Sequence, residues 1–359
     1  MKHVTMGAAA AALALGGALV MAAPDRAEAQ TMTLRFAEFG PNRGVRAEGL
    51  NWLAEQMSER SDGAMQLDII WGGALVGAAA TAQAISDGVA DMGSVVPVYA
   101  PGQLVVYETV DTLQFPDEWA GMMATYELMT THPDALAEAE DFNVVYFGNY
   151  TTGPTQLLTR DRAVRTTDDL EGLTIRATGP FVPAMEAFGA ATVSVAQPGV
   201  YEALSSGVVD GSTTYYYVVE GYSQYEVANY MTMLDMGQTL GFGIFMNRDV
   251  YMSMSEDNRA LIGELGRDFT EHMAMLMHAS RTDTRDRLAA GIDGNVVEMV
   301  EPDADARAAL IEVAEAHGAR WAERATEKGL DAGAIQGRFR ELVDQHLAIV
   351  ESDGYPWDR

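Results

Sequence analysis

A single arginine stands out because the chain after it offers no other positive charge over a long stretch. Arg176 closes the sequence Gly-Leu-Thr-Ile-Arg that begins at Gly172, and the next Lys or Arg is Arg248. The planar guanidinium group of arginine can donate two parallel, charge-assisted hydrogen bonds to one carboxylate. We therefore expect Arg176 either to form a structural salt bridge within the protein or to bind the carboxylate of a ligand.

Further candidate side chains lie just after predicted strands. Ligands of open α/β sheets bind outside the carboxyl ends of the strands, so residues at those ends are the candidates for a site. In the first half of the chain they are Phe39, Asn42, Trp71 and Ser94. In the second half they are Arg176 and the residues after Gly211. Phe39 and Trp71 would fit the hydrophobic core equally well.

Three consecutive tyrosines follow the second-half candidates. The run from Tyr215 to Tyr217 is typical of a strand, which would place Tyr215 and Tyr217 on one face and Tyr216 on the other. Because the run begins directly after the candidate loop, we expect Tyr215 and Tyr217 to form a wall of the pocket.

Motifs for enzymatic chemistry are missing from the sequence. There is no G-x-G-x-x-G after a strand, no P-loop, no H-E-x-x-H, no G-x-S-x-G and no cysteine. His272 and His278 fall on different faces of one predicted helix, so a metal pair is not expected. We predict a binding protein with no catalytic residue, no metal and no cofactor. A periplasmic enzyme such as a hydrolase is the remote alternative.

The elements that position these residues form an alternating pattern that occurs twice. The predicted strands are residues 33–37, 65–71 and 92–96, then 173–177 and 192–196, with short helices between them. This order favours parallel, doubly wound sheets. The sequence from Ala84 to Asp91 also matches that from Ala203 to Asp210 in its Ala, Ser, Gly, Val and Asp positions. The match predicts two structurally equivalent lobes, although a common way of ending a helix could produce it by chance.

Longer amphipathic patterns follow in the last third of the chain. They predict helices over residues 255–287, 304–328 and 332–350.

The stretch from Gly172 to Gly211 resembles the signature region of the extracytoplasmic solute receptors of TRAP transporters, the DctP family. The residues that carry the resemblance are the Gly-Leu-Thr-Ile-Arg strand and the Val-Val-Asp-Gly sequence that ends at Gly211. The resemblance implies that Arg176 grips the carboxylate of an organic acid. It also implies a protein that closes on its ligand by a hinge motion and delivers it to a membrane permease.

The same resemblance implies a two-lobed α/β fold of the periplasmic binding protein type. Each lobe would be a mostly parallel sheet flanked by helices, with long helices spanning the lobes and a helical C-terminus packed on the second lobe. The implied boundaries are residues 30–155 plus about 243–285 for lobe I and residues 156–242 plus about 286–359 for lobe II. The ligand cleft would lie between the lobes.

The sequence departs from the family at two positions of the expected site. Gln156 falls where the sialic-acid-binding branch has a second arginine, and Thr214 replaces an asparagine that normally contacts the carboxylate. A branch that binds keto and hydroxy acids holds a cation with a glutamine, the arginine, a glutamate and an aromatic residue. Gln156 and Tyr215 match that set loosely, but the glutamate is missing, so no metal is predicted.

These departures favour one kind of ligand. A surplus anionic group buried without a partner is costly, so we predict a monocarboxylate with an apolar or aromatic body. The alternative is a C4-dicarboxylate whose second carboxylate is held by Arg43 or Arg46.

The N-terminus has the features of a secretory signal peptide. Lys2 and His3 precede an apolar run over residues 7–23, and Ala27-Glu28-Ala29 offers a small-residue cleavage site. We expect residues 1–29 to be removed and the mature protein to be soluble in the periplasm; an uncleaved membrane helix is the alternative. The net charge of −29 argues against nucleic-acid partners. We expect a monomer that serves a TRAP permease, or alternatively one that reports to a sensor.

Overall fold

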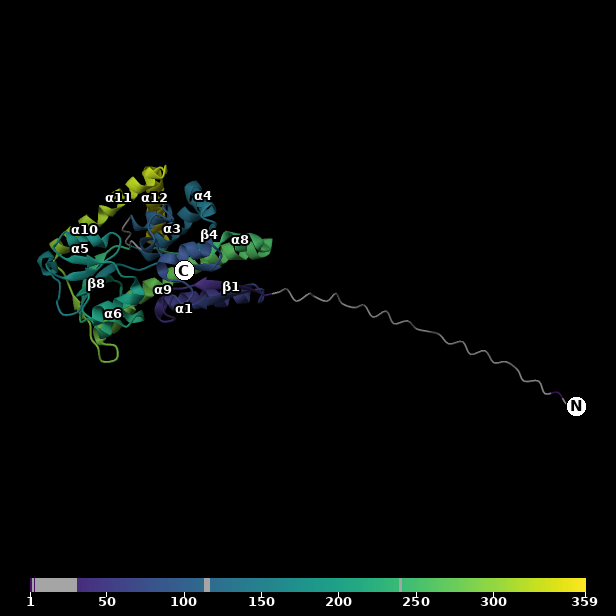
Figure 1. Cartoon of the computed structure of the whole chain (residues 1–359), viewed down its shortest axis with the longest axis horizontal. Coiled ribbons are helices and arrows are strands. Elements are labelled where there is room, and N and C mark those ends of the chain that lie inside the picture. The colour runs from purple at the N-terminus through teal and green to yellow at the C-terminus, as the bar shows by residue number, and fades with distance from the viewer. Residues whose placement is uncertain (2, 4–30, 113–116, 239–240) are drawn as a thin grey trace.

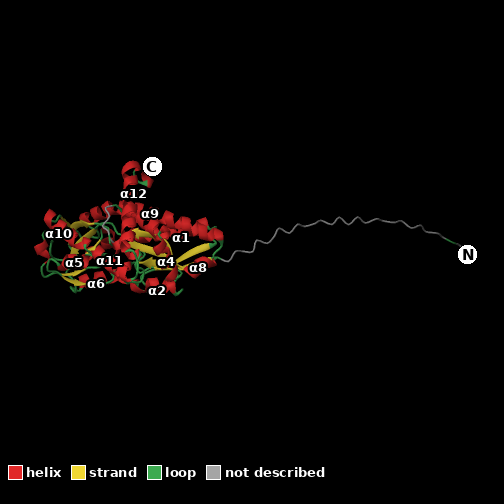
Figure 2. Ribbon diagram, turned by 90° about the horizontal axis from the view of Figure 1, so that it is seen from above, coloured by secondary structure: helices red, strands yellow, loops and turns green. Residues whose placement is uncertain are grey.

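The structure is a computed structural model, and it describes residues 1, 3, 31–112, 117–238 and 241–359. The predicted signal peptide therefore lies almost entirely outside the described residues. Two groups of strands and helices lie side by side, and α9 (Glu256–Ala290) runs across both (Figure 1). Figure 2 shows the same arrangement from above, with α5, α6 and α10 at one end of the molecule and α1, α2 and α8 at the other. None of the described helices is long and apolar enough to cross a membrane.

The first lobe is built on a five-stranded sheet. Its strands, in spatial order, are β2 (Met65–Ile70), β1 (Met32–Ala37), β3 (Met92–Val95), β10 (Gly241–Asn247) and β4 (Val144–Thr151). The strand β1 forms because Leu34 and Phe36 alternate with exposed residues and both are buried. The helices around this sheet are α1 (Gly44–Arg60), α2 (Thr81–Ser86), α3 (Glu118–Thr131), α4 (Pro133–Asp141) and α8 (Arg248–Ser253).

The second lobe is built on a six-stranded sheet. Its strands, in spatial order, are β11 (Glu298–Val300), β9 (Tyr230–Met236), β5 (Thr155–Thr159), β8 (Gly211–Thr214), β6 (Thr174–Arg176) and β7 (Ala191–Val193). Its helices are α5 (Phe181–Glu186), α6 (Val200–Ser205), α7 (Tyr216–Gly221) and α10 (Ala304–Glu315). The two-lobed α/β fold predicted from the sequence is confirmed.

Both sheets are mixed, with one strand in each that runs antiparallel to its neighbours, so the expectation of mostly parallel sheets is confirmed. The neighbours β1, β2 and β3 are parallel, but β10 pairs antiparallel with β3 and β4. In the second sheet β5 is antiparallel to both β8 and β9. The antiparallel strand of each sheet is the one with which the chain enters from the other lobe. The strand β5 enters the second sheet after the chain leaves β4, and β10 returns to the first sheet after β9.

The internal repeat has a structural counterpart in the two lobes. The carboxylate of Asp91 accepts the backbone N–H of Arg35 at 2.7 Å, and that of Asp210 accepts the backbone N–H of Thr174 at 2.8 Å. Each aspartate also donates its own N–H to the carbonyl of the same residue. The sequence match therefore marks equivalent positions, and it places Arg176 at the end of the second-lobe strand that corresponds to β1.

The long helix α9 joins the two hydrophobic cores. Its N-cap, Ser255, accepts the backbone N–H of Asn258. Leu265, Phe269 and Met273 repeat every four residues and are buried in the first-lobe core, whereas Leu288 is buried with residues of the second lobe. One continuous helix thus connects both lobes, as expected.

The C-terminal helices differ from the prediction in two ways. The predicted helix over residues 304–328 is two helices, α10 and α11 (His317–Glu327), which meet at Ala316. The last helix, α12 (Ala332–Asp353), packs on α3 and shares the first-lobe core with α11, instead of packing on the second lobe. The assignment of residues 286–359 wholly to lobe II is therefore corrected at α11 and α12.

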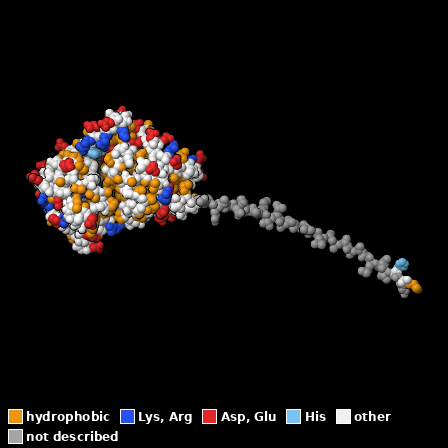
Figure 3. Space-filling view, in the orientation of Figure 1, with side chains coloured by type: hydrophobic (Ala, Val, Ile, Leu, Met, Phe, Trp, Pro, Cys, Tyr) orange, Lys and Arg blue, Asp and Glu red, His pale blue; other side chains and the backbone are white. Residues whose placement is uncertain are grey.

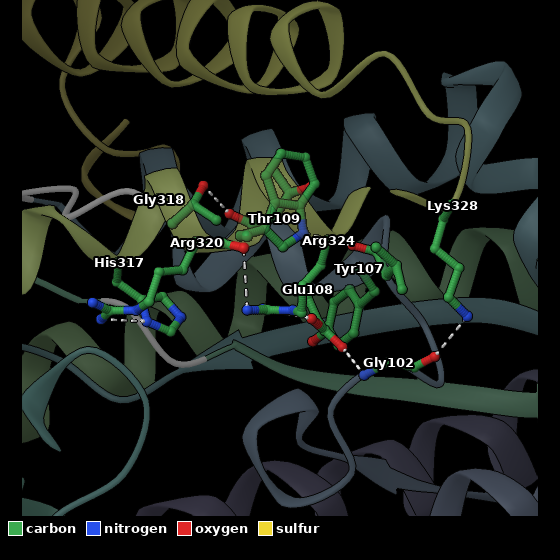
Figure 4. Close-up of polar contacts among 12 residues, drawn as sticks. Gly102, Tyr107, Glu108, Thr109, His317, Gly318, Arg320, Arg324 and Lys328 are labelled. Atoms are coloured by element: carbon green, nitrogen blue, oxygen red, sulfur yellow. Dashed lines mark hydrogen bonds and ion pairs between the residues drawn. The ribbon is translucent and has the colours of Figure 1, made fainter. Parts of the chain in front are cut away.

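Specific contacts hold α11 on the first lobe. Trp321 is fully buried and donates its indole N–H to the carbonyl of Val105 at 2.8 Å. Figure 4 shows Arg324 beside Glu108 of the 3₁₀ helix η3 (Tyr107–Asp111), with an ion pair of 3.1 Å. Glu108 also accepts the backbone N–H of Gly102. A buried aromatic anchor and a carboxylate with two partners explain why this helix docks where it does.

Candidate functional site

A small, partly open cavity lies between the lobes at the carboxyl ends of β1, β3 and β6. It is lined by Phe39, Arg46, Val96, Tyr99, Arg176, Gln197, Tyr215, Tyr217, Val218, Tyr222 and Phe242. Tyr99 belongs to the 3₁₀ helix η2 (Pro97–Tyr99) of the first lobe, and Gln197 begins η5 (Gln197–Gly199) of the second. Both lobes therefore supply side chains to one site, at the sheet edge where the sequence predicted it.

Arg176 reaches this cavity from the last position of β6, and its side chain is buried. The guanidinium group donates to the carbonyl of Val195 at 2.8 Å, to the carbonyl of Thr213 at 3.3 Å and to the hydroxyl of Tyr99 at 3.3 Å. All of these acceptors are neutral. Among the described residues, no carboxylate forms an ion pair with Arg176, in contrast to the structural salt bridge that the sequence left open.

A second buried arginine in the cavity is neutralised by the protein itself. Arg46 of α1 lies 3.0 Å from a carboxylate oxygen of Glu38, which is fully buried. Glu38 also accepts the hydroxyl of Ser94 at 2.6 Å and the backbone N–H of Gly40 at 2.7 Å. The carboxylate therefore has three partners, and this corner of the cavity carries no net charge.

Aromatic side chains form the walls between the two arginines. Tyr215 and Tyr217 stack with ring centroids 6.3 Å apart, and Phe39 and Phe242 stack at 6.1 Å. Burial raises the pKa of Tyr222 to about 12, so its hydroxyl is neutral at physiological pH and can donate. The arrangement offers flat apolar faces between two polar corners.

The tyrosine run is a helix start, which corrects the predicted strand. Tyr215 has extended backbone angles and precedes α7, which begins at Tyr216. Tyr215 and Tyr217 nevertheless line the cavity, while Tyr216 packs in the second-lobe core. The prediction of a strand from residue propensity was wrong because the packing of the three tyrosines, toward the cavity and toward the core, decides the backbone conformation.

The cavity contains Phe39, Arg176, Tyr215 and Tyr217 of the predicted site residues. The structure places the others outside its lining. Gln156 donates a hydrogen bond of 2.8 Å to Asp235 and so links β5 to β9. Ser94 donates its hydroxyl to Glu38, the carboxylate that pairs with Arg46. Thr214 is buried at the end of β8.

Asn42 and Trp71 also lie outside the cavity. Asn42 accepts a hydrogen bond from Asn51 in a separate hollow beside α1, α7 and α9. Trp71 is half-buried and packs against the first-lobe core, the alternative that the sequence had left open.

Sequence reasoning missed several lining residues for identifiable reasons. Tyr99 and Gln197 follow β3 and β7 within a few residues, so the strand-end rule could have found both. Phe242 lies at the start of β10, and no local signal tells that β10 returns antiparallel to the first sheet. Arg46 was considered only as a holder of a second carboxylate, whereas it lies in the cavity paired with Glu38.

A separate polar cluster lies where α3 and α9 meet near the C-terminus. Asp117, Glu118 and His278 bring ligand atoms within 4.8 Å of one another, a spacing that could suit a metal ion. However, Arg281 lies 3.6 Å from Glu118, and Tyr355 donates its hydroxyl to Asp117 at 2.6 Å. These contacts indicate a hydrogen-bonded ion-pair network more than a metal centre.

Two lobes around a shared cavity with a buried arginine are typical of solute-binding proteins. The family model of bacterial extracellular solute-binding proteins, family 7, named DctP, matches residues 36–324, so the chain belongs to this family. The chain is 29% identical over 204 residues to a solute-binding protein of Chromohalobacter salexigens, and the match covers 55% of this chain and 59% of that protein. It is also 25% identical to a solute-binding protein of a Sulfitobacter species, covering 83% of this chain and 93% of the relative.

Solved structures share the fold over nearly their whole length. A TRAP solute-binding protein from Rhodoferax ferrireducens in complex with copurified benzoate has a TM-score of 0.78 and 24% identity, covering 89% of this chain and 100% of that one. A TRAP periplasmic solute-binding protein from Bordetella bronchiseptica with bound mandelate has a TM-score of 0.77 and 22% identity, covering 88% and 99%. At these identities the likeness establishes the fold.

Proposed function

We propose that the protein is the solute receptor of a TRAP-type transporter and binds a small organic monocarboxylate with an apolar or aromatic body. The charge inside the cavity carries the proposal. Arg46 is paired with Glu38, whereas the hydrogen bonds of Arg176 within the described residues go to neutral oxygens. One positive charge is left for a ligand, and a single carboxylate would balance it, because buried charges are stable only when paired.

The dicarboxylate alternative requires a second available guanidinium group. Arg43 donates two hydrogen bonds, at 2.9 Å and 2.7 Å, to the carbonyl of Gly221, and Arg46 is held by Glu38. A second ligand carboxylate would have to displace one of these contacts. The contacts therefore favour a monoanion.

The walls of the cavity support an apolar body for the ligand. The stacked pairs of Tyr215 with Tyr217 and of Phe39 with Phe242 suit a ring or a short carbon chain. The benzoate and mandelate found in two proteins of the same fold are acids of this kind.

Binding would close the lobes, because contacts of the cavity cross between them. The hydroxyl of Tyr99 accepts from Arg176 and from the backbone N–H of Gln197, both at 3.3 Å. A ligand that touches both lobes would stabilise the closed form by its differential affinity for that form.

The family is extracellular, and the remaining features of its setting are part of the proposal. We expect residues 1–29 to direct export to the periplasm, where the mature protein acts as a monomer with a membrane permease and without catalysis. A receptor that reports to a sensor would use the same cavity. Intact-mass analysis of the exported protein should give a chain that starts at Gln30.

A thermal-shift screen tests the function. The purified mature protein would be incubated with benzoate, phenylacetate, mandelate, pyruvate, lactate, succinate and malate. Aromatic or short monocarboxylates should raise the melting temperature, because a ligand stabilises the state that binds it. The acid should be recovered unchanged at one molecule per chain. Strong stabilisation by succinate or malate alone would contradict a monoanion site, and formation of a product would indicate an enzyme.

A further inference from the structure

Two polar side-chain atoms of the cavity residues are buried without a hydrogen-bond partner among the residues that the structure describes. They are the amide nitrogen Nε2 of Gln197 and the hydroxyl oxygen of Tyr222. A buried polar group that loses its hydrogen bonds to water and gains none is destabilising, so such groups call for an explanation. Because both residues line the ligand cavity, a bound ligand is the natural partner for each.

The two atoms belong to different corners of the cavity. The backbone N–H of Gln197 and the guanidinium group of Arg176 donate to the same hydroxyl, that of Tyr99. Gln197 therefore belongs to the Arg176 corner. Tyr222 belongs to the other corner, since the guanidinium carbon of Arg46 lies 5.7 Å from the centre of its ring.

The corners differ in charge and so in the group that each can receive. The Arg176 corner has a positive charge, and a carboxylate there can accept from Arg176 and from the amide of Gln197. The hydroxyl of Tyr99 already accepts two hydrogen bonds, so its own proton is free to donate to the same carboxylate. The Arg46 corner is neutral because Glu38 balances Arg46, so an anionic group there would be unpaired.

We propose that the ligand carries, at the end of its apolar body away from the carboxylate, one uncharged oxygen group such as a hydroxyl or a carbonyl, and that Tyr222 binds it. Gln197 joins Arg176 in binding the carboxylate. The substrate class is then a hydroxylated or keto monocarboxylate, and Tyr222 and Gln197 determine specificity at the two ends. The inference rests on the proposed monocarboxylate function and narrows it.

Calorimetry with matched acids tests the carboxylate end and the uncharged end of the ligand separately. The probes are benzoate, 3-hydroxybenzoate and 4-hydroxybenzoate, titrated into the wild-type protein and into Tyr222→Phe, Gln197→Leu and Tyr216→Phe. We expect at least one hydroxybenzoate to bind the wild type about fivefold more tightly than benzoate, the effect of one neutral hydrogen bond. Tyr222→Phe should abolish this advantage, so that benzoate and the hydroxybenzoates bind the variant with similar affinities.

The other variants test the assignment of the ends. Gln197→Leu should weaken all three acids by a similar factor, because it acts on the carboxylate that they share. Tyr216→Phe removes a tyrosine hydroxyl outside the cavity and should change none of the affinities, and the melting temperature of each variant establishes that it is folded. If benzoate and the hydroxybenzoates bind equally, or if the advantage survives in Tyr222→Phe, the inference is overturned while the monocarboxylate function stands. If none of the three acids binds but succinate does, the inference and the monocarboxylate function are both contradicted.

Discussion

The pairing of Arg46 with Glu38 is the residue-scale feature that sets the charge of the ligand. The two side chains are almost fully buried and lie 3.0 Å apart. Glu38 thereby removes from the cavity a positive charge that could otherwise hold a second ligand carboxylate. Selectivity for monoanions depends on this carboxylate as much as on Arg176.

Replacing Glu38 with Gln should therefore change which acids bind. The variant leaves Arg46 unbalanced, so the ratio of succinate affinity to benzoate affinity should rise by at least about tenfold, and the ligand-free protein should melt at a lower temperature. Calorimetry with both acids measures the ratio. Glu48→Gln, which removes the same charge at an exposed position of α1, is the control. An unchanged ratio in Glu38→Gln would refute the charge argument.

The residues themselves indicate how far the sequence could predict the site. Arg176 and Phe39 were found because Arg176 ends a strand and Phe39 follows one at the edge where ligands bind. Gln156 and Ser94 also lie near that edge, but their side chains are satisfied by Asp235 and Glu38. Which neighbour a polar side chain selects depends on three-dimensional packing, and no spacing in the sequence encodes it.

At the scale of elements, the C-terminal segment is fastened to α3 and α9 by titratable groups. The rings of Tyr355 and Trp357 stack at 4.6 Å, and His278 lies 4.6 Å from the ring of Tyr355. The hydrogen bond to Glu118 raises the pKa of His278 above its ordinary value, since the protonated ring is favoured beside a carboxylate.

This shift predicts a pH dependence of stability. A histidine whose pKa is raised on folding stabilises the native state at pH values below its unfolded pKa of about 6.5, and the stabilisation is lost as the pH rises through the native pKa. The urea midpoint should fall between pH 6 and pH 8, and His278→Gln should remove that part of the fall. Glu118 and Asp117 face His278 as carboxylates, and Arg281 is the opposing cation. A midpoint whose pH dependence is the same in both proteins would contradict this assignment.

Elements with a strong hydrophobic periodicity were predicted correctly. The prediction failed where tertiary packing overrides the local sequence pattern. The helix α9 and the repeated strands follow from their burial patterns. The helix α7 was missed because consecutive tyrosines favour strands. The break at Ala316 was missed because no Pro lies there and the nearby Gly318 lies inside the next helix, where a glycine can be tolerated.

At the scale of the whole molecule, hydrogen bonds link the two lobes directly. Arg43 of the first lobe donates twice to the carbonyl of Gly221 in the second. The acidic side chains, by contrast, are scattered over the surface in Figure 3 and gather at no single place on that face. Electrostatic attraction of an anion must therefore arise inside the cavity, and closure must hold the ligand there.

Arg43→Ala should loosen closure without altering selectivity. Removal of the contact with Gly221 should raise the dissociation rate of every bound acid by a similar factor of about three to ten, because the variant acts on the closed state and not on the ligand. Stopped-flow measurement with two different acids checks this expectation. A change in the preference between the acids, with no change in dissociation rate, would place Arg43 in the binding site instead.

The most direct test of the account is calorimetry of Arg176 variants with the tightest acid from the screen. We predict that Arg176→Ala costs about 2 to 5 kcal/mol of binding free energy, as when one partner of a buried charge pair is removed. Arg176→Lys should bind with intermediate affinity because it keeps the charge and loses the two parallel hydrogen bonds. Arg165→Ala, an exposed arginine of the second lobe, should bind like the wild type. If Arg176→Ala binds within about threefold of the wild type, Arg176 is structural and the central claim is contradicted.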